Sequence, residues 1–97
     1  MKSTKEYIEL LRQFMQQKGA KYGISRMGIF GSVARGEQNE NSDVDILFEG
    51  KANLLLHVRI KNELEELLGS PVDLVRMRNQ LNGTSLKQSI LNDVIFV

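Results

Sequence analysis

The stretch GIFGSVARGEQNENSDVDILFE, residues 28–49, decides the fold of this chain. An apolar run ends at Gly31-Ser32, a polar loop follows, and a second apolar segment begins at Asp43. Asp45 lies two residues further on, so both carboxylates are expected on one face of a strand. We therefore predict a strand over residues 25–30, helical turns over 32–36, a loop over 37–42 and a strand over 43–49.

The segments on either side of this stretch carry clear helix boundaries. Ser3 and Glu6 match a capping box that starts a helix, which is expected to end before Gly19. Asn53 and Gly69 match the two ends of a second helix. The complete pattern predicts helices over residues 3–18, 54–68 and about 85–92, and further strands over 71–76 and 94–97.

The alternation of strands and helices predicts an α/β (α+β) fold in a single domain over residues 1–97. We expect a small mixed β-sheet of about four strands, covered by helices. Apolar residues at helical spacing should face this sheet. They are Tyr7, Leu10, Leu11, Phe14 and Met15 in the first helix, and Leu56, Ile60, Leu64 and Leu67 in the second.

The composition excludes several classes of protein. The 97 residues are 41% hydrophobic and 26% charged, as in an ordinary soluble domain. No apolar run approaches the ~18 residues that span a bilayer, and the polar N-terminus lacks an export signal, so a cytoplasmic protein without membrane contact is expected. With no cysteine and one histidine, His57, a metal should be Mg²⁺ or Mn²⁺ held by oxygen. His57 itself is expected to be solvated.

The Gly31-Ser32 pair is a candidate phosphate-binding turn. A strand that turns abruptly into a helix leaves backbone N–H groups without partners, and these groups favour an anion. Glycine allows close approach of the ligand, and the serine hydroxyl adds a contact. The alternative is an ordinary strand-to-helix turn, because Gly-Ser pairs are common turn residues.

Three aspartates form a candidate metal site. Asp43 and Asp45 can reach one cation or bridge two, and a cation would offset their mutual repulsion. Asp73 interrupts the apolar segment PVDLV and joins them if its strand is a neighbour. It could then act as a general base. The alternative for each aspartate is a solvated position on an exposed strand face.

Together these segments resemble the nucleotidyltransferase superfamily related to DNA polymerase beta. Ten residues separate Gly31-Ser32 from Asp43, and Asp73 follows downstream. The likeness extends from Arg26 to the C-terminus, and it is greatest to the smallest members, the minimal nucleotidyltransferase (MNT) proteins. The matching stretches are GSVARG at 31–36, SDVDIL at 42–47 and VDLV at 72–75.

The resemblance implies a polymerase beta-like fold and the transfer of a nucleoside monophosphate from a triphosphate. By that likeness, Gly31 and Ser32 bind the β- and γ-phosphates of ATP, and Asp43 and Asp45 hold two Mg²⁺ ions. Asp73 would complete the metal site and help to deprotonate the attacking hydroxyl. Arg35 is a further candidate for phosphate binding, with a plain surface position of the short helix as the alternative.

We expect the acceptor to be a partner protein, since no segment is left for an acceptor-binding domain. MNT proteins typically pair with a HEPN-domain RNase toxin in toxin–antitoxin systems. The resemblance thus implies an antitoxin that forms a hetero-oligomer with this toxin and transfers AMP from ATP to one of its tyrosines. The net charge of +1, without a basic stripe, predicts no direct nucleic-acid binding. Two alternatives remain: an antitoxin acting by contact alone, and an enzyme acting on a small molecule or RNA.

Overall fold

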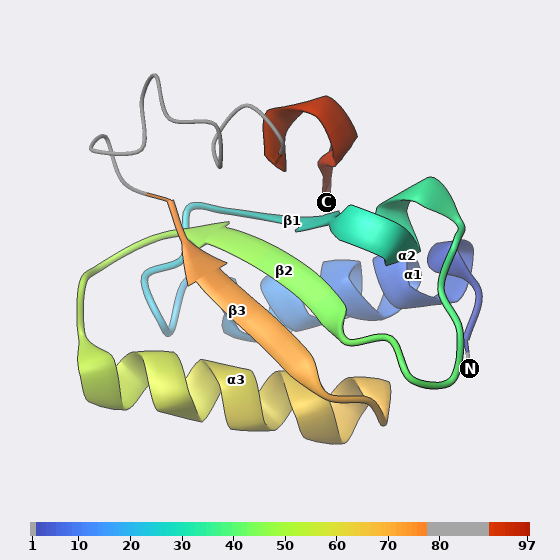
Figure 1. Cartoon of the computed structure of the whole chain (residues 1–97). Coiled ribbons are helices and arrows are strands. Elements are labelled where there is room, and N and C mark those ends of the chain that lie inside the picture. Colours follow the sequence, from blue (N-terminus) through green and yellow to red (C-terminus); the bar gives the residue numbers. More distant parts are fainter. Residues whose placement is uncertain (1, 78–89) are drawn as a thin grey trace.

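The computed structural model describes residues 2–77 and 90–97, which form a four-stranded mixed sheet (Figure 1). The strand order is β3-β2-β1-β4. β2 pairs with β3 in parallel, whereas β1 is antiparallel to both β2 and β4. The predicted small mixed sheet is confirmed. The strands are β1 (Arg26–Phe30), β2 (Val44–Glu49), β3 (Val72–Arg76) and β4 (Ile95–Phe96).

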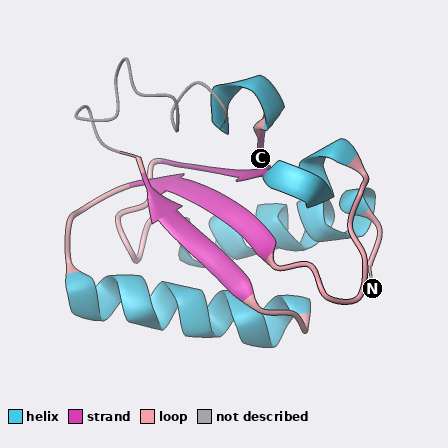
Figure 2. Cartoon of the chain, in the orientation of Figure 1, coloured by secondary structure: helices cyan, strands magenta, loops and turns pink. Residues whose placement is uncertain are grey.

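Long helices cover one face of this sheet, and a short helical segment lies over part of the other, as Figure 2 shows. Residues 90–93 are helical and lie on the opposite side of the sheet from α1 and α3. Within the described part of the chain, no helix combines the length and apolar character that a membrane crossing requires. The labelled helices are α1 (Thr4–Phe14), η1 (Met15–Gly19), α2 (Gly31–Arg35) and α3 (Leu54–Leu68).

The hydrophobic core lies between the sheet and the helices α1 and α3. Alternate residues of β2 point into it, as the sequence predicts, and their neighbour Leu47 is buried on the other face. Burial of these apolar side chains is the main source of stability for a domain of this size. The core includes Tyr7, Leu11 and Phe14 of α1, Val44, Ile46 and Phe48 of β2, and Ile60, Leu64 and Leu68 of α3.

Helix α1 begins where the sequence predicts and continues into a π-helical turn. The Ser3 hydroxyl accepts the Glu6 N–H at 3.2 Å, and the Glu6 carboxylate accepts the Ser3 N–H at 3.1 Å, which confirms the capping box. The α-helix ends at Phe14, and a π-helical turn over Met15–Gly19 extends the helical segment to Gly19, where the sequence predicts its end. Gly19 is buried within a π-helical turn, and the chain takes a left-handed conformation only at Gly23, where φ is 67°. The Ile24 N–H donates to the Gly19 carbonyl at 2.8 Å.

Helix α3 has the predicted boundaries, but the residue that faces the core in its last turn differs from the prediction. The Asn53 side chain accepts the Leu56 N–H at 3.0 Å, and Gly69 is left-handed with φ of 68°. Leu68 is fully buried, whereas Leu67 is 37% exposed, so the prediction for Leu67 is wrong. Both positions satisfy helical spacing after residue 64, and only the packing against the sheet distinguishes them.

The C-terminal segment is described only in part. The start of the helix predicted from about residue 85 lies outside the described residues, and residues 90–93 are helical as expected. The strand predicted over 94–97 is confirmed in a shorter form, as β4. Beyond it, the Val97 N–H donates to the Met27 carbonyl at 2.9 Å.

Gly28 allows β4 and the residue before it to pack closely on β1, and a larger residue there should destabilise the fold. A Cβ atom at this position would lie 2.8 Å from Val94 Cγ2 and 3.0 Å from Phe96 Cδ1. We expect Gly28→Ala to lower the free energy of unfolding by about 1–3 kcal/mol through overpacking. Urea denaturation measures this change.

The matched test for this explanation truncates the side chain that Gly28→Ala would meet first. Val94→Ala alone should lower the free energy of unfolding. In the Gly28→Ala background the same change should lower this free energy less, or raise it, because the two changes share one contact. Additive effects of the two substitutions would contradict the overpacking explanation.

Candidate active site

A glycine at the end of β1 brings the backbone against an aspartate. Gly31 is the first residue of α2, with φ of 72°, a left-handed conformation that favours glycine. A Cβ atom on Gly31 would collide with the Asp45 carboxylate and would lie 3.0 Å from its Cγ. Ser32 follows at a half-buried position. The predicted Gly-Ser turn is therefore formed, and it lies next to a predicted metal ligand.

The parallel pairing of β2 and β3 places two of the aspartates side by side. Asp45 pairs with Asp73 in the register, and on its other side it pairs with Phe30, the residue before Gly31. Neighbouring strands lie about 4.8 Å apart, and paired residues point to the same face. The predicted proximity of Asp73 to the β2 aspartates thus holds for Asp45. Their face is opposite to that of Ile46, which points into the core.

Asp43 lies just outside the strand that was expected to include it. The ladder begins one residue later, where the Val44 N–H donates to the Pro71 carbonyl at 2.9 Å. Asp43 is exposed, Asp45 is half-buried and Asp73 is exposed. Across residues 2–77 and 90–97, no three acidic or histidine side chains are gathered tightly enough to form a complete metal site. The fold therefore pairs Asp45 with Asp73 and leaves Asp43 at the entrance to β2.

The electrostatics of Asp45 show that the charges of the other two carboxylates act on it. Burial raises the pKa of Asp45, and the negative charges of Asp73 and then of Asp43 raise it further, while the positive charge of Arg35 lowers it. A divalent cation would offset this repulsion, and carboxylate oxygens are the ligands that Mg²⁺ prefers. The donor chemistry therefore fits the predicted metal.

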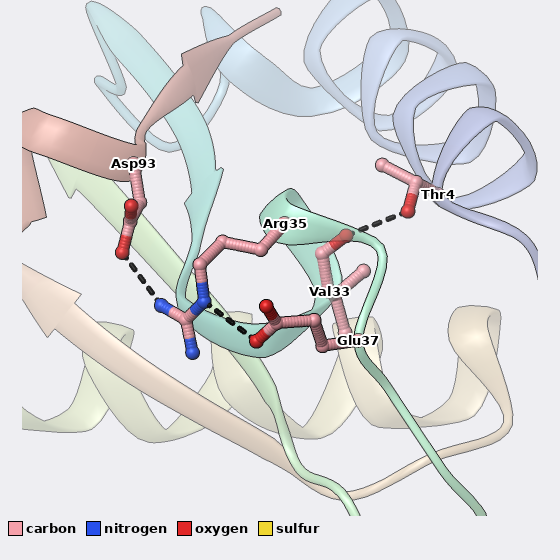
Figure 3. A network of polar contacts seen from close by, with 5 residues as sticks. All are labelled: Thr4, Val33, Arg35, Glu37 and Asp93. Carbon is pink, nitrogen blue, oxygen red and sulfur yellow. Dashed lines mark hydrogen bonds and ion pairs between the residues drawn. The ribbon is translucent and has the colours of Figure 1, made fainter.

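Arg35 is held by two carboxylates, as Figure 3 shows. Its Nε donates to Glu37 at 3.0 Å, and its Nη1 donates to Asp93 at 2.6 Å. Arg35 is exposed at the end of α2, which is the surface position that the sequence left open, and it makes both ion pairs there. No sequence signal identified Asp93 as a partner, because 58 residues separate the two.

Contacts from the N-terminus hold the short helix α2 in place. The Thr4 hydroxyl donates to the Val33 carbonyl at 2.6 Å (Figure 3). The Gln38 amide donates to the Lys2 carbonyl at 3.2 Å and lies 3.4 Å from the Thr4 hydroxyl. These bonds fix the turn after β1 from both ends of α2, and sequence reasoning missed them because they join distant segments.

His57 is not the solvated residue that the sequence predicts. Its Nε2 lies 3.1 Å from the Leu74 carbonyl, and its ring centroid is 5.6 Å from that of Phe48. This hydrogen bond joins α3 to β3. His57 therefore contributes to the packing of α3 on the sheet.

Gly31 and Gly36 form a matched pair for testing the contact with Asp45. Both are left-handed, with φ of 72° and 75°, but the space around Gly36 is open within 4 Å. Alanine at either position adds backbone strain of about 1 kcal/mol, and only Gly31→Ala also displaces the Asp45 carboxylate. Thermal unfolding should therefore show a larger loss of stability for Gly31→Ala than for Gly36→Ala. Equal losses would contradict the close packing.

Asp45→Asn should raise the thermal midpoint at pH 7 in a buffer with a metal chelator. The pKa of Asp45 is higher in the folded protein than in the unfolded chain, so the protonated carboxyl favours folding. This contribution is fully present below the unfolded pKa and is lost as the pH rises through the folded pKa. Asparagine stays neutral and does not lose it. The advantage of the variant should shrink as the pH falls from 7 toward about 4.

Scanning calorimetry across this pH range measures the effect, with Glu40→Gln as the control for an exposed loop acid. The control should follow the wild-type curve. An Asp45→Asn protein less stable than wild type at pH 7 would contradict the repulsion described for this site.

Comparison with known proteins agrees with this arrangement. A family model described as nucleotidyltransferase domain matches residues 8–97. The protein adenylyltransferase MntA of Thermococcus cleftensis is 36% identical, and the alignment covers all of this chain and 98% of the relative.

Solved structures share the fold over nearly the whole chain. A candidate minimal nucleotidyltransferase is 34% identical, with a TM-score of 0.74 over 97% of this chain and 95% of its own. A crystal structure of a toxin–antitoxin with AMP-PNP has a TM-score of 0.73 at 24% identity, covering 91% of this chain and 69% of its own. The chain described here thus belongs to the nucleotidyltransferase domain family, as one of its minimal members.

Proposed function

We propose that this chain is an antitoxin that transfers AMP from ATP to a tyrosine of a HEPN-domain RNase toxin and so neutralises the toxin. The observation that carries this proposal is the pairing of Asp45 with Asp73 directly beside the Gly31 turn. This places carboxylates next to a backbone that a phosphate can approach closely. A site with both features suits the transfer of a phosphoryl-linked group.

The Gly31-Ser32 turn would bind the β- and γ-phosphates of ATP. The space that a side chain at Gly31 would take is filled by the Asp45 carboxylate, which keeps this acid at the turn, and the half-buried Ser32 adds a hydroxyl donor. The contact between Thr4 and Val33 holds this turn rigidly, which lowers the entropic cost of binding.

The carboxylates would bind the metal and accept the proton. Asp43 and Asp45, with Asp73, would hold Mg²⁺, which when bound supplies positive charge to the phosphates of ATP. Asp73 is exposed and would take the proton of the tyrosine hydroxyl. The hydroxyl oxygen then forms a bond to the α-phosphorus, the bond from this phosphorus to the bridging oxygen breaks, and diphosphate leaves.

The identity of the partner rests on the relatives. A protein adenylyltransferase matches this chain along its entire length, which supports a protein acceptor. The MNT resemblance and a toxin–antitoxin of the same fold support a HEPN toxin as this acceptor. Neutralisation by contact alone is the competing function, and the mutual repulsion of the site's acids weighs against it. A protein that only binds gains nothing from a cluster of repelling charges.

Incubation with ATP, Mg²⁺ and a cognate HEPN-domain protein, which is to be sought in the neighbouring gene, should add one or more AMP units to that protein. Intact-mass spectrometry measures the gain, and tryptic fragmentation identifies the modified tyrosine. Asp45→Asn and Asp73→Asn should each slow the labelling at least 100-fold, because each removes a group in contact with the reacting atoms. Chelation of the metal should abolish labelling.

Glu40→Gln is the control for a nearby acid outside the site, and it should label at the wild-type rate. Neutralisation of the toxin should be lost together with labelling. Full neutralisation by Asp45→Asn at normal dose would establish the contact mechanism and reject the proposal. Labelling of RNA or of a small molecule in the absence of the partner would reject the protein acceptor.

A further inference from the structure

The ion-pair network around Arg35 connects the phosphate turn to the C-terminal segment. Arg35 is the last residue of α2, which begins at Gly31. Asp93 comes from the helical residues 90–93, on the face of the sheet opposite to α1 and α3. Figure 3 shows the guanidinium between the carboxylates of Asp93 and Glu37. A single side chain therefore joins three segments beside the candidate active site.

The two carboxylates use only two of the N–H groups of the guanidinium. Glu37 accepts from Nε and Asp93 from Nη1. A guanidinium carries five N–H donors, so most of them stay available. Among residues 2–77 and 90–97, no acceptor bonds Nη2. The charge of Arg35 also reaches Asp45 and stabilises its ionised form.

The network is anchored to the phosphate turn by the backbone. The Glu37 N–H donates to the Ser32 carbonyl at 2.8 Å, so the backbone of Glu37 is fixed to the turn. Glu37 is 64% exposed, whereas the Asp93 side chain is 23% exposed. The Asp93 bond is also shorter, at 2.6 Å against 3.0 Å. Asp93 is thus the stronger of the two restraints on Arg35.

We propose that Asp93 is a positioning residue for the triphosphate, because it holds the Arg35 guanidinium at the phosphate turn with its free donors directed to the β- and γ-phosphates. This inference rests on the proposed function, and it adds a residue outside the GSVARG, SDVDIL and VDLV stretches. Asp93 would act through Arg35 and would not contact the nucleotide.

Two opposing effects of Asp93 on nucleotide affinity can be compared. Fixing a long side chain in advance spares roughly 0.5–1.5 kcal/mol of ordering cost on binding, which corresponds to about a 2–13-fold change in Kd. The negative charge of Asp93 opposes the triphosphate, but this repulsion is weak across water and salt, and metal ions offset most of the nucleotide charge. We therefore expect the positioning effect to dominate.

The test measures binding of Mg²⁺-AMP-PNP and of AMP by isothermal titration calorimetry. The proteins are wild type, Asp93→Asn, Arg35→Gln and the double variant. Glu66→Gln serves as the control for loss of one exposed acid. Thermal unfolding of each variant confirms that binding is measured on folded protein. AMP lacks the β- and γ-phosphates, so its affinity reports on the rest of the site.

Asp93→Asn should weaken Mg²⁺-AMP-PNP binding about 3–10-fold and leave AMP binding unchanged. In the Arg35→Gln background, Asp93→Asn should have no further effect, because the group that it positions is gone. A purely structural role would weaken both ligands in either background, and that result would overturn the proposal. Unchanged or tighter AMP-PNP binding would also overturn it. Failure of the wild type to bind Mg²⁺-AMP-PNP would instead reject the proposed function.

Discussion

Close packing of two acidic side chains beside a glycine backbone is the constraint on which the rest of this structure depends. Asp45 and Asp73 are register partners, and Gly31 leaves no room for a side chain between the turn and Asp45. Burial, and then the repulsion from Asp73, raises the pKa of Asp45 and costs stability near neutral pH. The buried core on the opposite face offsets this cost, so the fold supports a site that is unfavourable by itself.

Local signals were sufficient to predict most of the fold. The boundaries of α3 follow from Asn53 and Gly69, whose capping roles depend only on neighbouring residues. Alternation in β2 likewise identified its core-facing side. The π-helical turn after α1 and the inner position of Leu68 were missed, because local spacing does not distinguish them from a regular helix and its neighbouring position.

For the candidate site, the sequence predicted the proximity of Asp73 to the β2 aspartates but missed the supporting contacts. The residues alone left open whether the two strands are neighbours, and the resemblance to MNT proteins implied that Asp73 completes the site. The bonds of Thr4 to Val33 and of Asp93 to Arg35 cross 29 and 58 residues, and no local pattern encodes them. Asp43 was placed one residue inside the strand because alternation alone does not show where hydrogen bonding begins. The sequence thus identified the residues of the candidate site, whereas the contacts that hold them in place could be identified only from the structure.

Mn²⁺ binding followed by electron paramagnetic resonance tests most directly whether the turn and the carboxylates form one site. With AMP-PNP present, the wild-type protein should take up Mn²⁺ in a ternary complex, because phosphate and carboxylate oxygens would share the ion. The double variant Asp45→Asn, Asp73→Asn should lose this uptake. Equal Mn²⁺ uptake by the double variant and the wild type would contradict the central claim that the pairing of β2 with β3 beside Gly31 creates the site.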